Sequence, residues 1–194
     1  VLSNVHEVDW RPSRPAGRED VLFVGSFDHP PNVDAARWAA REIMPLVRDE
    51  CPDAVLHVIG SNPTDEVRAL AGPGVEVHGW VEELEPHYAR SRVTLAPLRF
   101  GAGVKGKVGE SLSLGVPVVG TSVAVEGMHL EHGREVMVAD DAAGLAEAVV
   151  ALLTDDETWQ RMAEAGKSGI AAQFGPDVSR ATLQELLKSA DHEA

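Results

Sequence analysis

The sequence predicts an α/β protein with a doubly wound, mostly parallel, Rossmann-like sheet. Six short apolar runs alternate with segments that have helical spacing or helix-start signals, an alternation typical of parallel sheets. Three of the runs, VLFV, VLHVI and VPVV, are apolar at nearly every position, as expected of strands that helices cover on both faces. The length of 194 residues suits one domain, since domains usually have ~100–200 residues.

The expected elements follow one another along the chain, and most of them begin or end at a glycine, a proline or a capping residue. The apolar runs predict strands at residues 21–25, 54–60, 75–80, 93–97, 116–121 and 135–140. The intervening segments predict helices or helical turns at residues 30–50, 64–72, 81–91, 106–114, 142–155, 156–173 and 176–189. In a sheet of this kind ligands bind beyond the carboxyl ends of the strands, so the loops that follow the strands are the candidate sites.

Side chains near the helix ends predict further details. Asn32 is expected to be the N-cap of the first helix, and Pro45 is expected to kink that helix or to mark its weak end. Asp140 and Asp141 precede an alanine-rich helix and are expected to cap it. Residues 11–20, RPSRPAGRED, are polar and contain two prolines, which predicts an irregular arm.

The composition excludes some classes of protein. Acidic residues outnumber basic ones by 31 to 17, giving a formal net charge of −14, which opposes nonspecific binding of nucleic acid. No apolar run approaches the ~20 residues of a transmembrane segment. The first residues, VLSNVHEVDW, lack the regions of a signal peptide, so a cytoplasmic location is expected. Cys51 is the single cysteine, which excludes a disulfide or a Cys-based zinc site within the chain.

The segment GAGVKGKVGE, residues 101–110, matches two phosphate-binding patterns in part. Gly101, Gly103 and Gly106 spell G-x-G-x-x-G, but the dinucleotide fingerprint belongs in the first strand-to-helix turn, and here three expected strands come before the strand that leads into the segment. Gly101, Gly106 and Lys107 spell G-x-x-x-x-G-K, but a P-loop requires Ser or Thr next, and the chain has Val108. Neither motif is therefore expected.

The physical features that the two motifs share remain in this segment. A helix that begins near Gly106 presents unpaired amides and the positive end of its dipole, which is an anion site. Small residues such as Gly103 let the backbone approach a ligand, and Lys105 and Lys107 add positive charge; the alternative is a solvated loop with two lysines. Glu110 can accept two hydrogen bonds from a ribose diol, or it can compensate the helix dipole. Together these features favour a nucleotide site.

The stretch GKVGESLSLGVPVVGT resembles the C-terminal, donor-binding domain of retaining GT-B-fold glycosyltransferases (glycosyl transferases group 1), in which a Glu, a small-residue helix and Gly-x-Pro-Val-Val follow one another. VLFVGSFDHPPNVDA, VEVHGWVEEL and AVEGMHLEHGREVMVADD resemble other segments of that domain. The resemblance implies the C-terminal half of a GT-B architecture. Its parts would be an interdomain linker or arm over 1–19, a nucleotide-sugar-binding Rossmann-like domain over 20–173, and a C-terminal helix over 174–194 that can pack on a missing N-terminal domain.

The resemblance also assigns roles to single residues. Glu110 matches the glutamate that binds the ribose diol. The positions expected to meet the diphosphate are Gly25, Ser26, Gly103, Val108 and Gly109. The positions expected to meet the base, largely through their backbone, are His78, Gly79, Trp80 and Val81. For two of these an alternative stays open, because Trp80 can be a core or covering aromatic and His78 can point into packing.

The chain departs from the family pattern in charge. Many members have Arg and Lys in the first loop for the phosphates, and the matching positions here are Ser26 and Pro31. We expect Lys105 and Lys107 to supply the missing charge and to serve as the catalytic groups, with Arg99 as a further candidate. These cations would stabilise the leaving diphosphate, in which negative charge develops in the transition state.

The implied function is the donor-binding half of a metal-independent retaining glycosyltransferase that takes a hexose-type sugar from a nucleoside-diphosphate donor such as a UDP- or GDP-sugar. No metal and no cofactor are expected, and His129 and His132 are interpreted as loop or surface histidines. A sugar, lipid-linked or small-molecule acceptor would bind through the missing domain, so this chain alone is expected to be inactive, and the full-length enzyme to be cytoplasmic or peripheral to a membrane. Ala102 stands where the family has a glutamate that touches the donor sugar, which leaves sugar recognition open.

Two other functions are compatible with the sequence. One is half of a sugar-nucleotide epimerase of related GT-B architecture, although the helix followed by Gly-x-Pro-Val-Val favours the transferase. The other is a non-catalytic α/β nucleotide-binding or regulatory module such as a receiver-like domain. That module needs clustered acids at strand ends, and the first strand here ends in Gly25, Ser26 and Phe27, which argues against it.

Overall fold

The computed structural model describes residues 5–192, with side chains as far as residue 184, and its strands form one six-stranded sheet. The strand order is β3-β2-β1-β4-β5-β6, and each pair of neighbours is parallel. The strands are β1 (Glu19–Val24), β2 (Leu56–Ile59), β3 (Val75–Gly79), β4 (Ser91–Ala96), β5 (Val118–Gly120) and β6 (Met137–Val138). The predicted doubly wound parallel sheet is confirmed.

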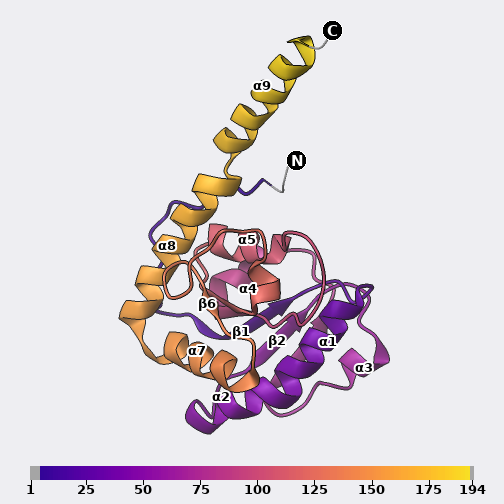
Figure 1. The fold of residues 1–194 in the computed structure, drawn as a ribbon. Coiled ribbons are helices and arrows are strands. Elements are labelled where there is room, and N and C mark those ends of the chain that lie inside the picture. The colour runs from indigo at the N-terminus through magenta and orange to yellow at the C-terminus, as the bar shows by residue number, and fades with distance from the viewer. Residues whose placement is uncertain (1–4, 193–194) are drawn as a thin grey trace.

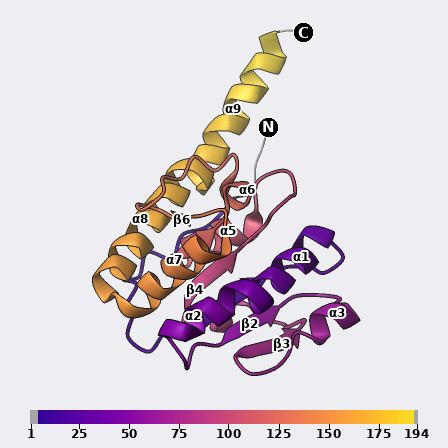
Figure 2. The same ribbon diagram turned by 60° about the horizontal axis from the view of Figure 1, so that its bottom comes forward.

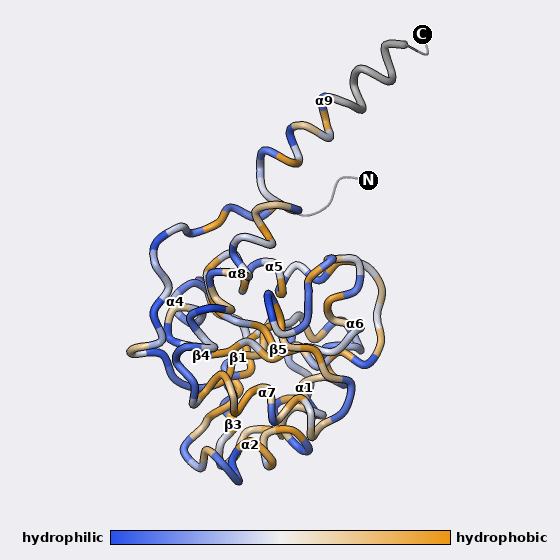
Figure 3. The backbone as a smooth tube through the Cα atoms, turned by 60° about the vertical axis from the view of Figure 1, so that its left-hand side comes forward, coloured by the Kyte–Doolittle hydropathy of each residue, from blue (hydrophilic) through white to orange (hydrophobic). Residues whose placement is uncertain are grey.

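Helices cover both faces of the sheet: α1, α2 and α7 lie on one side and α4 and α5 on the other (Figure 1). α8 packs against both α5 and α7. The helices are α1 (Pro30–Trp38), the π-helical η1 (Ala39–Ile43), α2 (Met44–Glu50), α3 (Asp65–Arg68), α4 (Glu85–Arg90), α5 (Gly106–Ser113), α6 (Ser122–Val125), α7 (Ala142–Thr154), α8 (Asp156–Phe174) and α9 (Pro176–His192). Figure 3 shows hydrophobic segments gathered in the central strands and hydrophilic ones in the surrounding loops.

Strand β1 shows why the apolar runs are nearly continuous. Val21 and Phe23 belong to the larger hydrophobic core, which also contains residues of α1, α2 and α7. Leu22 and Val24 point to the other face, where they pack in a second cluster with Tyr88 of α4. Because both faces are covered, every one of these four strand positions is buried.

The strand order places a topological switch point between β1 and β4. The chain runs from β1 outward to β2 and β3, and then returns to the other side of β1 to form β4. The helices that follow these two neighbouring strands, α1 and α5, therefore lie on opposite faces of the sheet (Figure 1). Open α/β sheets bind ligands in the crevice at such a point, so the loops after Val24 and Ala96 flank the candidate site.

Helix α5 is docked on the sheet by a buried polar contact. The Ser111 hydroxyl lies 2.7 Å from Thr94 Oγ1 and 3.0 Å from the Val116 carbonyl oxygen. Val108 and Leu112, on the same helix, are fully buried. The two buried hydroxyl groups hydrogen-bond only when the helix lies in one position on the sheet. In this position the amino end of α5 lies at the switch point.

The first helix begins and bends differently from the prediction. Asn32 is not its N-cap: His29, with an extended backbone, occupies that place, and two prolines fill the first two helical positions. Proline suits these positions because the N–H that it lacks has no intrahelical partner there. The helix passes through the π-helical turn η1 just before Pro45 and then continues as α2, so Pro45 does not end the helix, and the predicted kink stays a prediction.

One of the two predicted aspartate caps is present. Asp141 Oδ1 accepts from the Gly144 amide at 2.8 Å and caps α7. Asp140 does not cap this helix: its Oδ1 accepts from the Ser122 amide and lies 2.9 Å from the Ser122 hydroxyl. Asp140 thereby connects the end of β6 to the start of α6, because parallel strands β5 and β6 end at the same edge of the sheet.

An irregular arm, residues 5–18, crosses the domain beside α5 and α8. The His6 amide donates to the Phe174 carbonyl at 2.9 Å, and the Asp9 amide donates to the Ser113 carbonyl at 3.0 Å. These contacts bind the arm to the carboxyl ends of both helices.

At the other end of the chain, α9 continues from α8 and leaves the body of the domain (Figure 2). The division into a linker (1–19), a nucleotide-sugar-binding domain (20–173) and a C-terminal helix (174–194) stays a prediction, and residues 1–4 and 193–194 of it lie outside the described residues. Within residues 5–192, no helix combines the length and the apolar character needed to cross a membrane.

The close approach of two loops at the carboxyl edge of the sheet gives a test of the fold. A Cβ on Gly60 would lie 1.7 Å from the Gly25 carbonyl oxygen, whereas a Cβ on Gly72 would have no atom within 4 Å. Gly60→Ala should lower the free energy of unfolding by about 3 kcal/mol, the upper part of the range for overpacking, because backbone must move. Gly72→Ala is the matched control and should change it by less than about 0.5 kcal/mol. Urea denaturation measures both, and equal stability of the two variants would contradict the described contact.

Candidate functional site

Asn32 connects the two loops that meet at the switch point. Its Nδ2 donates to the Ser26 carbonyl at 2.7 Å, and its Oδ1 accepts from Lys107 Nζ at 2.6 Å. Asn32 is 8% exposed, and a Cβ on Gly25 would lie 2.8 Å from its side chain. The structure therefore brings together Gly25 and Ser26, which follow β1, and Lys107, which begins α5.

Lys107 is a half-buried cation. Its Nζ lies 4.9 Å from the centroid of the Phe23 ring, on which a cation is favoured. Burial, and secondarily the nearby charge of Lys105, lowers the pKa of Lys107 to about 8. Among the described residues no carboxylate pairs with this ammonium group, and the Asn32 amide oxygen is its acceptor. The group is therefore prepared to receive an anion, whose charge would return its pKa toward the ordinary range.

The first turn of α5 offers two further donors. No side chain caps this helix. The Val108 and Gly109 amides donate to the Lys105 carbonyl at 3.0 and 3.4 Å, whereas the Gly106 and Lys107 amides have no acceptor among the hydrogen bonds described for residues 5–192. The assignment of Val108 and Gly109 to the diphosphate stays a prediction, and the open amides of this helix belong to the two residues before them.

The loop before α5 contains the other predicted small residue and the other lysine. Gly103 has φ +79° and Gly101 has φ +129°, conformations that glycine adopts without strain. The loop is exposed at both positions. Lys105 Nζ donates to the Gly103 carbonyl, so this lysine closes the loop on itself. Lys105 thus contributes a positive charge beside Lys107 while its own ammonium group is held by the backbone.

Arg99, the further candidate for the missing charge, is committed elsewhere. Its Nε donates to Asp34 Oδ2 at 2.9 Å, and its guanidinium lies 5.0 Å from the centroid of the Trp38 ring. The Arg99 hydrogen bond, assisted by Arg37, holds the pKa of the Asp34 carboxyl below its usual range. Since Asp34 neutralises it, Arg99 is a weaker phosphate ligand than the two lysines.

Glu110 lies one turn into α5, where Tyr88 of α4 orients it. The Tyr88 hydroxyl donates to Glu110 Oε2 at 3.4 Å. Burial raises the pKa of Tyr88 above its ordinary value, and the neighbouring Glu110 charge raises it further, so the phenol remains a donor. Burial also raises the pKa of Glu110. Among the described residues Oε1 of Glu110 has no donor, which leaves that oxygen for a ligand hydroxyl.

The predicted base segment ends β3 and turns outward. Trp80 is 70% exposed, which excludes its interpretation as a core aromatic. Val81 packs in the cluster that contains Tyr88, so the segment and Glu110 share one neighbour. The His78 side chain lies 2.9 Å from His57 Nδ1, and burial, followed by the charge of His57, lowers the pKa of His78. The base-binding roles of His78, Gly79, Trp80 and Val81 stay predictions.

Ser26 lies in a small polar network of the first loop. Its Oγ donates to Asp28 Oδ2 at 3.0 Å and accepts from the Ser61 hydroxyl at 3.0 Å. The Asn62 amide donates to the same Asp28 oxygen at 2.8 Å and, together with Ser26, holds the pKa of Asp28 below its usual range. Asp28 is thus held in its charged form by neutral donors, and the Ser26 carbonyl is the part of this loop that contacts Asn32.

Two residues of the site were missed in the sequence. Asn32 was interpreted as a helix cap, and its contact with Lys107 joins positions 75 apart in the chain. Tyr88 lies 22 positions from Glu110 and follows no motif. Only the order of the strands brings either pair together, so no local pattern could have predicted these contacts.

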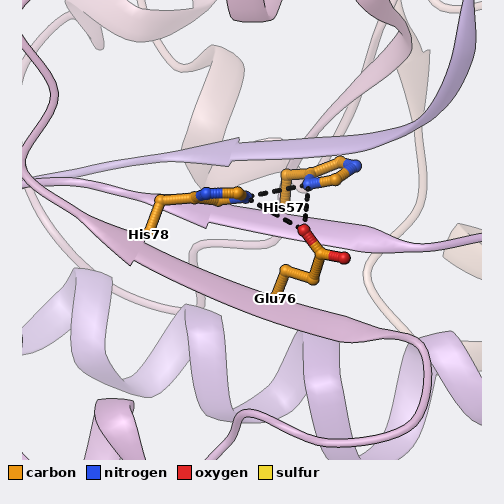
Figure 4. A group of neighbouring side chains, drawn as sticks. All are labelled: His57, Glu76 and His78. Atoms are coloured by element: carbon orange, nitrogen blue, oxygen red, sulfur yellow. Dashed lines mark hydrogen bonds and ion pairs between the residues drawn. The ribbon is translucent and has the colours of Figure 1, made fainter.

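The expectation that the chain binds no metal stays a prediction, but the structure brings together one group of possible metal ligands that the sequence analysis did not single out. Within residues 5–192, His57, Glu76 and His78 present ligand atoms that all lie within 4.8 Å of one another (Figure 4). Of the histidines considered from the sequence, His129 has φ +49° outside any helix and His132 accepts from the Val138 amide through Nδ1. The signal for the cluster was the alternation Glu-x-His in an expected strand, which puts both side chains on one face.

Relatives among known proteins are glycosyltransferases or uncharacterised. The chain is 31% identical over 165 residues to a GDP-mannose-dependent alpha-(1-6)-phosphatidylinositol monomannoside mannosyltransferase of Mycobacterium tuberculosis, which covers 76% of this chain and 43% of the relative. It is 27% identical over 141 residues to an uncharacterized 44.6 kDa protein in the cps region of Klebsiella pneumoniae, covering 68% of this chain and 36% of that protein. The chain thus spans less than half the length of the curated relatives it matches.

Solved structures share the fold. Staphylococcus aureus TarM, in a complex with UDP, matches with a TM-score of 0.76 at 12% identity over 96% of this chain and 38% of its own. Anabaena HepE, in complex with UDP and glucose, matches with a TM-score of 0.72 at 15% identity over 90% of this chain and 49% of its own. A family profile described as Glycosyl transferases group 1 matches residues 18–155. With this match over most of its length, the chain belongs to the glycosyl transferases group 1 family and has the Rossmann-like fold of a GT-B glycosyltransferase domain.

Proposed function

We propose that this chain is the donor-binding half of a metal-independent retaining glycosyltransferase that takes a hexose-type sugar from a nucleoside-diphosphate donor. The observation that supports this most concerns Lys107. Its ammonium group is half-buried and has no carboxylate partner among the described residues, and it lies at the uncapped start of α5, next to the switch point of the sheet. A diphosphate supplies the negative charge that such a site lacks. The mannosyltransferase relative described as GDP-mannose-dependent and the UDP complex of HepE support the same class of donor.

In this proposal the chain stabilises the leaving group. When the bond between the sugar and the diphosphate breaks, negative charge accumulates on the diphosphate oxygens, and donors already in place lower the energy of that state. The Lys107 ammonium and the open amides of Gly106 and Lys107 are such donors, Lys105 adds charge nearby, and Gly25 and Gly103 allow the backbone to come close. Glu110 holds the ribose, and the exposed Trp80 and its neighbours meet the base.

The proposal places the acceptor outside this chain. The acceptor, a sugar, a lipid-linked sugar or a small molecule, would bind to an N-terminal domain, and α9 and the arm of residues 5–18 would connect to it. The chain alone should therefore bind a nucleoside diphosphate and transfer nothing. The full-length enzyme would act in the cytoplasm or at a membrane surface.

Lys107→Met tests the diphosphate site, since methionine keeps an apolar stem against Phe23 and removes the charge. The variant should bind UDP or GDP, whichever the chain binds more tightly, roughly 10–150-fold more weakly, because a hydrogen bond to a charged group contributes ~1.5–3 kcal/mol. Arg41→Met makes the same change of charge at an exposed position of η1 and should leave the affinity unchanged. Calorimetric titration measures the three proteins, and an unaltered affinity in Lys107→Met would refute the assignment.

The low pKa of Lys107, about 8, predicts two effects of pH with opposite signs. Above pH about 8 the folded lysine loses its proton, so the affinity for a nucleoside diphosphate should fall as pH rises. Between pH about 8 and the ordinary lysine pKa of ~10.4 the unfolded chain binds the extra proton, so the contribution of Lys107 to stability should rise with pH. Nucleotide titrations measure the affinity and urea denaturation measures the free energy of unfolding, both at steps of roughly one pH unit between pH 7 and 10. Both slopes should flatten in Lys107→Met, and parallel slopes in the two proteins would show that another group titrates.

Glu110→Gln tests the ribose contact. Glutamine keeps the size of the side chain but weakens acceptance from a diol, so the affinity for the ribonucleoside diphosphate should fall by roughly tenfold or more. The affinity for the matching 2′-deoxy compound should fall less, because that ligand has already lost one hydroxyl. A double-mutant comparison of protein and ligand measures the coupling. Equal losses for both ligands would assign Glu110 to the helix dipole instead.

A further inference from the structure

His57, Glu76 and His78 form a compact group on one face of β2 and of the edge strand β3 (Figure 4). His57 Nδ1 lies 2.9 Å from His78 Nε2, and Glu76 Oε2 lies 3.4 Å from the former and 3.5 Å from the latter. In a tetrahedral zinc site with bonds of ~2.0–2.1 Å, ligand atoms are separated by about 3.3–3.4 Å. The three atoms therefore already have nearly the spacing of three corners of such a site.

A β-bulge puts His78 in this position. His57 is paired with Glu76, and Val58 with Val77, but Ile59 is paired with Gly79. His78 is thus the extra residue of β3, and the bulge brings it back toward His57. Bulges are rare in parallel pairs and are concentrated where a side chain has to be re-aimed near a functional site.

The ring nitrogen of His57 that points away from the group, Nε2, contacts a carboxylate, as is common for histidines that bind metals. Asp20 Oδ2 lies 3.2 Å from His57 Nε2, so Nε2–H can donate to the carboxylate while Nδ1 presents its lone pair to the group. Histidine ligands in proteins are commonly oriented by such a carboxylate. Asp20 itself has φ +63°, a conformation that aspartate adopts more readily than most residues other than glycine, and its Oδ1 accepts from the Val55 amide at 2.9 Å.

The group opens into a cavity with room for a further ligand. The cavity has a volume of about 250 Å³ and is lined by Gly17, Glu19, Asp20, His57, Glu76, His78, His87, Arg90 and Ser91. Three carboxylates against one guanidinium give this lining a negative balance that suits a cation. Glu19 and Ser91 begin β1 and β4, so the cavity opens toward the amino ends of the strands, opposite to the edge that holds Lys107.

We propose that His57 Nδ1, His78 Nε2 and Glu76 Oε2 bind a first-row divalent metal ion of the zinc class, with water in the remaining coordination position. Two imidazoles and a carboxylate with an open position are a common ligand set for such ions. Asp20 is the positioning residue that orients His57. The metal site shares His78 with the predicted base segment, whereas His57 and Glu76 have no assigned role in the donor site.

Calorimetric titration of the untagged, metal-free chain with zinc chloride tests the proposal without any nucleotide. One equivalent should bind, and cobalt(II) at the same site should give the visible absorption of a tetrahedral complex. Glu76→Gln and His78→Ala should each weaken zinc binding by more than roughly 100-fold, and Asp20→Asn by roughly 10–100-fold. Glu76 is well exposed, with 58% of its side chain accessible, so Glu76→Gln should fold normally even where a histidine variant does not.

The matched controls are Glu82→Gln, an equal loss of charge at an exposed position after β3, and His129→Ala, the loss of a distant histidine. Both should bind zinc as the parent chain does. No binding at millimolar zinc would overturn the proposal, and so would one-equivalent binding that survives in both Glu76→Gln and His78→Ala. Neither result would bear on the donor site, which is tested by nucleotide affinity alone.

Discussion

The candidate donor site depends on one polar link, from the Ser26 carbonyl through Asn32 to the ammonium group of Lys107. This link joins a loop after β1 to a helix after β4, two segments that are neighbours only because the strand order reverses at this point. The buried contact of Ser111 with Thr94 of β4 holds the same helix against the sheet. These two contacts hold the amino end of α5, with its open amides and the charge of Lys107, at the switch point.

That arrangement has an energetic cost in the absence of a ligand. A half-buried ammonium group with an amide oxygen as its acceptor is less stable than one in water, and its lowered pKa is a measure of the loss. An ion pair with an aspartate would remove the cost, and Arg99 shows this solution a few residues away with Asp34. Lys107 has no such ion pair among the described residues. A bound anion can therefore offset the desolvation free energy of Lys107, and the site favours a negatively charged ligand over a neutral one.

How much the sequence predicts differs between the fold and the site. The alternation of apolar runs with helices predicts the sheet, because covered strands are apolar along their length and that signal is local. The glycine-rich segment likewise predicts an anion site, because its glycines, its lysines and the helix start all lie within one short stretch of sequence. The roles of Asn32 and Tyr88 depend on contacts across the strand order. Asn32 is not the cap that its residue type suggests, because the two prolines directly before it already occupy the first helical positions. The Glu-x-His alternation predicts that Glu76 and His78 share one face of β3, but their contact with His57 depends on the pairing of β3 with β2, which a single sequence does not reveal.

The edge strand β3 contributes to both candidate sites, one at the carboxyl ends of the strands and the other near their amino ends. Its last residue, Gly79, accepts from the Gly60 amide at 2.8 Å, so the backbone before Trp80 is held at the carboxyl edge. Within the same strand, Glu76 and His78 use the alternation of side chains to face the cavity at the other edge. An edge strand has one neighbour and is the least restrained part of a sheet, and the links from His57 to both side chains therefore restrain the strand where its backbone pairing is irregular.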